Sequence, residues 1–195
     1  MAAINRSTDM TTGSIWKRMV SFAVPVFLGN LCQQLYNTVD SVIVGKFVGK
    51  QALAAVASSG NLIFMMTGFF MGLFIGAGIV IAQYFGAKNY EKVRAAVHTD
   101  FAFALCCGVL LTLLGVFFTP TILTWMRTPA DVLSTSILYF RLYFLGSLAT
   151  ILYNAGMGIL QAAGDSRSPL YYLVISSVVN VALDLLFVGA MDMGV

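Results

Sequence analysis

Charged residues are scarce in this sequence: only 10% of its 195 residues are Asp, Glu, Lys or Arg, whereas 59% are hydrophobic. Soluble domains carry about 25% charged residues, so a water-soluble globular fold is excluded. Intrinsic disorder is excluded too, because it requires low hydrophobicity and high charge. The net charge of +3 is too small and too dispersed for a nucleic-acid-binding surface. The composition predicts an all-α membrane protein with several spans.

Cysteine and histidine are also rare, with three residues and one residue. Cys32, Cys106 and Cys107 are odd in number and lie in apolar stretches, so they form neither a disulfide framework nor a metal-binding pattern. His98 precedes a long apolar run, where we expect it to be solvated. These residues therefore predict no soft-metal site. As separate expectations, the protein is not an enzyme and has no cofactor.

Long uncharged runs define the predicted spans, because a membrane-crossing helix needs about 20 mostly apolar residues. We predict a transmembrane domain over residues 15–195 behind a polar cytoplasmic segment, residues 1–14, with five helices over roughly residues 16–44, 51–84, 96–118, 132–160 and 169–188. Glycines in the second helix either break it or allow close helix packing, and packing is favoured. Ser168 is expected to cap the fifth helix before a first-turn proline, Pro169.

The basic residues predict the orientation in the membrane. A cytoplasmic N-terminus places seven basic residues inside and three outside: Arg6, Lys17, Arg18, Lys88, Lys92, Arg94 and Arg167 against Lys46, Lys50 and Arg127. We therefore expect a multi-pass protein of the cell inner or plasma membrane with its N-terminus in the cytoplasm. The sequence stops soon after the fifth helix, so we expect a piece of a longer protein.

Three ionisable residues are expected at membrane depth: Asp40, Arg141 and Asp184. Each costs several kcal/mol on insertion scales and therefore requires an explanation. The first and fifth predicted helices run in the same direction, and each carries its aspartate near its outer end. We therefore expect Asp40 and Asp184 to meet in one leaflet, at the height that Arg141 reaches from the fourth helix.

Neighbouring polar residues extend this pattern. Asp40 shares a helix face with Gln33, Tyr36 and Asn37, and Asp184 lies one turn from Asn180. Carboxylate and amide oxygens suit a proton or Na⁺ better than a soft transition metal. Two carboxylates in a poorly solvated cavity repel each other, and a bound cation relieves that repulsion.

Structural explanations remain open for the same residues. Asp40 can pair with Lys46 at the outer interface, and Arg141 can extend its side chain toward the headgroups. Tyr139 and Tyr143, near a span end, are typical of an aromatic belt. Pro25 removes a backbone hydrogen bond and bends the first helix, either as a hinge or as a static kink.

Several segments together resemble multidrug and toxic compound extrusion (MATE) transporters. They cover roughly residues 15–188 and are Gln33 to Asp40, Val44-Gly45, Ala52 to Val56, Ala82 to Ala87, Gln161 to Asp165, and Ser168-Pro169 with Asn180 and Asp184. The resemblance implies a parent fold of twelve helices in two lobes, of which this sequence supplies five helices of the six-helix N-terminal lobe. The partners it implies are the lipid bilayer, the sixth helix, the C-terminal lobe and small cationic or amphipathic substrates.

The resemblance further implies a cation-coupled antiporter that uses H⁺ or Na⁺ to export drugs and toxic compounds. Its cation site would consist of Asp40, Asp184, Asn180, Tyr139 and Asn154, with Tyr36 close by and Pro25 as the hinge. If the ion is Na⁺, its ligands would include Asp40, Asn180 and Asp184. A flippase of lipid-linked saccharides, which shares the general fold, is the alternative. An intramembrane aspartyl protease is disfavoured because Val39 and Leu183 stand where its motifs require other residues.

Overall fold

The computed structural model describes residues 14–47 and 50–191, and every regular element in them is a helix. The elements are α1 (Ile15–Phe47), α2 (Lys50–Gly86), α3 (Tyr90–Trp125), α4 (Ala130–Ala162), α5 (Arg167–Asp184) and the π-helix η2 (Leu185–Ala190), which continues α5. The predicted all-α class is confirmed. The predicted polar segment lies, except for Ser14, outside the described residues, and so does Val195.

The helices are longer than the predicted spans, most clearly in α3. This helix begins at Tyr90 instead of residue 96 and ends at Trp125 instead of residue 118. Its start is stabilised by Asn89, whose side chain accepts a hydrogen bond from the Lys92 backbone N–H, and by Glu91 in the first turn. The prediction followed the uncharged run alone, whereas a helix can continue into the interface with polar residues.

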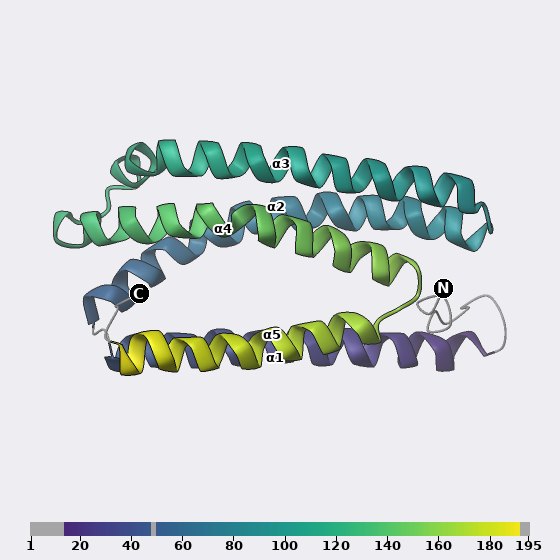
Figure 1. The fold of residues 1–195 in the computed structure, drawn as a ribbon, viewed down its shortest axis with the longest axis horizontal. Coiled ribbons are helices and arrows are strands. Elements are labelled where there is room, and N and C mark those ends of the chain that lie inside the picture. The colour runs from purple at the N-terminus through teal and green to yellow at the C-terminus, as the bar shows by residue number, and fades with distance from the viewer. Residues whose placement is uncertain (1–13, 48–49, 192–195) are drawn as a thin grey trace.

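The helices form two layers (Figure 1): α2, α3 and α4 lie together above the pair of α1 and α5. Helices α1 and α5 pack along each other and run in the same direction, as the sequence predicts. Helix α1 ends and α2 begins at one end of the bundle, and the turn from α4 to α5 lies at the opposite end (Figure 1).

Close packing in the upper layer depends on small residues of α3. A Cβ added at Gly108 would lie 2.5 Å from Leu148 Cδ1 and 3.2 Å from its Cα, and one at Gly115 would overlap the Phe144 ring. The Thr112 and Ser147 hydroxyls form a hydrogen bond across the same interface at 3.0 Å. The backbone of α3 therefore lies close to α4, an approach that small residues permit between helices in lipid.

Helix α2 is unbroken from Lys50 to Gly86, so the alternative of a break in this helix is wrong. Packing nevertheless explains only one of the four glycines. A Cβ at Gly78 would lie 3.5 Å from the carbonyl oxygen of Gly158 in α4, whereas one at Gly68, Gly72 or Gly76 would meet no described atom within 4 Å.

Within the described residues, four segments are long and apolar enough to cross a membrane: Ile63–Gly86, Tyr90–Trp125, Val132–Ala162 and Arg167–Phe187. Helix α1 is not among them, although it is 33 residues long. Polar residues in its second half, such as Gln33, Gln34 and Asp40, lower its hydropathy. A crossing α1 therefore needs polar partners inside the bundle.

The turn from α4 to α5 is closed by Asp165 and not by Ser168, which corrects the sequence prediction. Helix α5 begins at Arg167, so Ser168 and Pro169 already lie in its first turn. The Asp165 carboxylate accepts hydrogen bonds from the backbone N–H of Arg167 (3.1 Å), the backbone N–H of Ser168 (3.0 Å) and the Ser168 hydroxyl (2.6 Å). Gly164, with φ of 81°, makes the reversal that brings Asp165 to this position.

Replacing Asp165 by alanine is expected to destabilise the protein by about 1 to 3 kcal/mol, because it leaves buried backbone N–H groups without acceptors. Chemical unfolding of the full-length protein in detergent measures this change. Ser166→Ala is the matched control, since the neighbouring Ser166 is equally buried but makes no side-chain capping hydrogen bond. Equal losses in the two variants would contradict the capping role.

Candidate cation site between α1 and α5

Asp40 on α1 and Asp184 on α5 face each other across the contact between the two parallel helices. Their carboxyl groups are close enough to interact directly, and both side chains are half-buried. The register that places them side by side follows from the parallel course of α1 and α5 (Figure 1). The structure thus brings together the two acids that the sequence places at one height.

One face of α5 presents a line of oxygen atoms that lack donors. Ser177 Oγ, Asn180 Oδ1 and Asp184 Oδ2 are buried and have no hydrogen-bond partner within the described part of the chain. Their spacing of three and four residues places them on one helix face. Because buried polar atoms in proteins are nearly always paired, three unpaired oxygens on the α5 face that carries Asp184 indicate a place for a proton or a cation.

The chemistry of these oxygen atoms, as ligands, favours a hard cation. Carboxylate, amide and hydroxyl oxygens are the ligands that such ions prefer. No group of three or more His, Cys, Asp or Glu residues able to hold a metal ion occurs within the residues that the structure describes. Asn180 and Asp184, two of the predicted Na⁺ ligands, lie on one face of α5, and the third, Asp40, interacts with Asp184. Ser177 lies on the same face of α5, two turns before Asp184.

Three tyrosines surround the acid pair. Tyr36 interacts electrostatically with Asp40, Asp184 and Tyr143, and Tyr139 interacts with Asp40, Tyr36 and Tyr143. The structure therefore places Tyr36 and Tyr139 where the sequence predicts. Tyr143 belongs to the same cluster, although the sequence assigns it to an aromatic belt. Its spacing of four residues from Tyr139 was the signal for a shared face.

Asn37 is not part of this cluster, although it lies one turn from Asp40. Its side chain is exposed, and its amide donates a 3.4 Å hydrogen bond to the Gln34 side chain. The predicted polar stripe therefore narrows to Gln33, Tyr36 and Asp40, which are all half-buried.

Asn154 and Pro25 lie farther along the bundle, at a cavity of about 290 Å³ between the two layers. The Asn154 amide donates a hydrogen bond to the Thr150 carbonyl oxygen at 2.8 Å. Gln33 also lines this cavity, so α1 connects the cavity to the acid pair through Tyr36. Among the described residues, those that line the cavity carry no charge. They include Pro25, Asn30, Gln33, Tyr153, Asn154 and Gln161.

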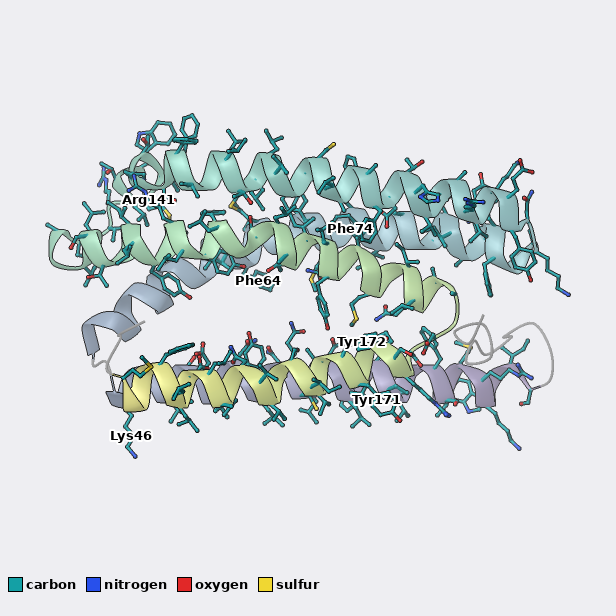
Figure 2. The ribbon with its side chains drawn as sticks, in the orientation of Figure 1. Lys46, Phe64, Phe74, Arg141, Tyr171 and Tyr172 are labelled. Atoms are coloured by element: carbon teal, nitrogen blue, oxygen red, sulfur yellow. The ribbon has the colours of Figure 1, made fainter. Side chains whose placement is uncertain are left out.

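Two basic side chains near this end of the bundle point outward. Arg141 is exposed on α4 and lies toward the same end as Lys46 (Figure 2). Lys46, at the end of α1, projects away from the bundle in the same view. These orientations agree with the interfacial role that the sequence leaves open for Arg141.

The backbone changes directly after Asp184, where α5 passes into the π-helix η2. Helices of this kind usually occur as single turns at functional sites. The Leu185 N–H is shared between the carbonyls of Val181 and Ala182, and the Met191 N–H reaches the Leu186 carbonyl. The wider turn therefore starts at the residue that faces Asp40.

Comparison with known proteins identifies relatives of this architecture. The chain is 39% identical over 170 residues to the probable multidrug resistance protein YoeA of Bacillus subtilis strain 168, covering 87% of this chain and 37% of that protein. It superimposes with a TM-score of 0.85 on a crystal structure of MATE in the straight conformation, at 25% identity, covering 98% of this chain and 41% of the other. A crystal structure of MATE in the bent conformation also gives a TM-score of 0.85, at 24% identity, covering 100% of this chain and 42% of that one.

The chain therefore spans less than half the length of the relatives that it matches. The family model called MatE matches residues 25–186, which contain both acids, the tyrosines and the cavity. From this match and these relatives, the chain belongs to the MatE family of multi-pass membrane transporters.

Proposed function

We propose that this chain is the N-lobe part of a cation-coupled antiporter that exports cationic or amphipathic drugs and toxic compounds. The observation that carries the proposal is the acid pair, Asp40 and Asp184, together with the unpaired oxygens of Ser177 and Asn180. Two adjacent carboxylates with little water repel each other, so binding H⁺ or Na⁺ between α1 and α5 is favourable. The relatives named as multidrug resistance proteins support export of such compounds.

Coupling follows if the cation and the substrate favour different arrangements of the two layers. A ligand shifts a conformational equilibrium only by its difference in affinity for the two states. A cation between Asp40 and Asp184 holds α1 against α5, whereas a cationic substrate is attracted by the same acids when they are ionised. Cation entry from outside therefore promotes substrate release. The sixth helix and the C-terminal lobe would complete the pathway.

The cavity supports an uncharged or cationic substrate over an anionic one. The cavity is lined by apolar side chains with some amide and hydroxyl groups, and none of its described lining residues is basic. A flippase of lipid-linked saccharides would need basic residues to hold the pyrophosphate. Arg141, the base at comparable depth, is exposed on α4. The flippase alternative therefore has less support.

Imposed ion gradients test the proposal in proteoliposomes that contain the full-length transporter. We expect accumulation or loss of a cationic dye to follow either a pH gradient or a Na⁺ gradient, each imposed with the other ion at equal concentration on both sides. Dye movement that depends on neither gradient would refute cation coupling. Movement of a labelled lipid-linked saccharide instead would favour the flippase.

The topology needs its own test. We propose that the N-terminus and the turns from α2 to α3 and from α4 to α5 face the cytoplasm, because Lys88, Lys92, Arg94 and Arg167 are exposed at that end. Single cysteines in these turns would then react with a membrane-impermeant thiol reagent only in inverted vesicles.

Pro25 is proposed as the hinge of α1. Helix α1 continues through Pro25, which lines the cavity and cannot donate the backbone hydrogen bond that an alanine would restore. Similar MATE structures include a straight and a bent conformation. A proline inside a helix costs about 3 kcal/mol relative to alanine, so it lowers the energy needed to bend α1.

Pro25→Ala is therefore expected to slow export by about tenfold, equivalent to about 1.4 kcal/mol of barrier. Initial rates of cation-driven efflux measure the effect. Pro120→Ala is the matched control, because Pro120 also lies inside a helix but not at the cavity. A normal rate for Pro25→Ala would refute the hinge.

A further inference from the structure

Asp100 lies on the face of α3 that packs into the upper layer. It precedes Ala104 and Gly108 by one and two turns, and all three residues are buried. Ala104 belongs to a core cluster with Phe74 of α2 and Ile151 of α4. The Asp100 side chain is therefore directed toward α2 and α4, and not toward the candidate cation site on α1 and α5.

One oxygen of this carboxyl group is buried without a partner among the described residues. The residue is 6% exposed, and its Oδ1 atom has no hydrogen-bond partner within the described residues. The facing stretches of α2 and α4, residues 63–86 and 142–162, contain no charged residue, and their titratable groups are Tyr84, Tyr143 and Tyr153. On α3 itself, the charged or titratable neighbours Glu91, Lys92, Arg94 and His98 are exposed.

Asp165 is a buried carboxyl group with hydrogen-bond donors in the same protein. It is 8% exposed, nearly as buried as Asp100, but it accepts hydrogen bonds from Arg167 N–H, Ser168 N–H and the Ser168 hydroxyl. Such donors stabilise negative charge. Asp100 Oδ1 accepts no hydrogen bond from any residue that the structure describes, so the contrast lies in the surroundings of the two carboxyl groups and not in their burial.

An isolated buried carboxylate is so costly that the group neutralises instead. We propose that Asp100 is a proton-binding site of the α2–α3–α4 layer, separate from Asp40 and Asp184, and that it stays protonated while this layer is packed. Its proton exchanges with water only when the layer loosens near the turn from α2 to α3. In the proposed topology that end faces the cytoplasm, so this site equilibrates with cytoplasmic protons.

Infrared spectroscopy of the full-length transporter in lipid nanodiscs tests this proposal without using transport as a readout. With aspartate labelled by ¹³C at its side-chain carboxyl carbon, the carbonyl band of a protonated side chain is distinguished from other bands by its isotope shift. We expect Asp100→Asn to remove the signal of about one aspartic acid at neutral pH. Asp165→Asn, the matched control, is expected to leave that signal unchanged.

The result that would overturn the proposal is an aspartic acid signal of equal size in wild type and Asp100→Asn. If Asp100→Asn does not fold, Asp40→Asn and Asp184→Asn supply the measurement. A protonated aspartate that persists in the double variant supports Asp100 as the site, and its absence refutes it. Loss of cation coupling in that double variant is a separate result, so the two proposals fail independently.

Discussion

Replacing Asp40 by asparagine in the full-length transporter is expected to abolish most cation-driven export. The amide keeps the shape of the carboxyl group but removes the charge that holds H⁺ or Na⁺ against Asp184, so the cation no longer favours one arrangement of the helices. Coupling free energies of this kind typically correspond to between about 5-fold and 150-fold in affinity. We therefore expect the rate of the gradient-dependent part of efflux to decrease by a factor of about 5 to 150.

Two controls separate this effect from damage to the fold. Thr38→Ala changes an exposed side chain of the same helix, whose hydroxyl donates a hydrogen bond to the Gln34 carbonyl at 2.8 Å, and should leave efflux unchanged. If Na⁺ is the coupling ion, adding it should raise the melting temperature of the wild type by mass action but not that of Asp40→Asn. Full gradient-driven efflux by Asp40→Asn would refute the cation site.

Gly115→Ala is expected to cause a large loss of stability. The added Cβ would overlap the ring of Phe144, which is 1% exposed and packed against Leu123 and Phe140. Because the ring is buried against α3, either the ring must leave its present position or α3 and α4 must separate. Overpacking of this kind costs about 1 to 3 kcal/mol, and occasionally more.

Chemical unfolding of the detergent-solubilised protein measures the loss, and Gly72→Ala serves as the comparison. A Cβ at Gly72 would meet no described atom within 4 Å, and alanine improves helix propensity by about 1 kcal/mol. Gly72→Ala should therefore leave stability unchanged or raise it. If Gly115→Ala is as stable as Gly72→Ala, the close packing of α3 on α4 is wrong.

Asp100 and Asp165 show where reasoning from the sequence was insufficient. Asp100 lies inside the predicted third span, yet it borders an uncharged run and was not counted among the ionisable residues at membrane depth. Its spacing of four and eight residues from Ala104 and Gly108 indicates a shared helix face with these small residues, and this pattern could have predicted its burial. For Asp165, the Ser-Pro pattern favoured Ser168 as the cap, whereas the left-handed Gly164 places the aspartate there.

The sequence alone determined the helical class, the approximate spans and the common height of Asp40 and Asp184. These follow from hydropathy and from helical spacing, which are local properties of the chain. The tertiary structure decided which polar groups have no partner among the described residues: Asn180 and Ser177 on the α5 face that carries Asp184, and Asp100 in the other layer. Whether a side chain finds a donor depends on which helices pack against it, and no local pattern contains that information.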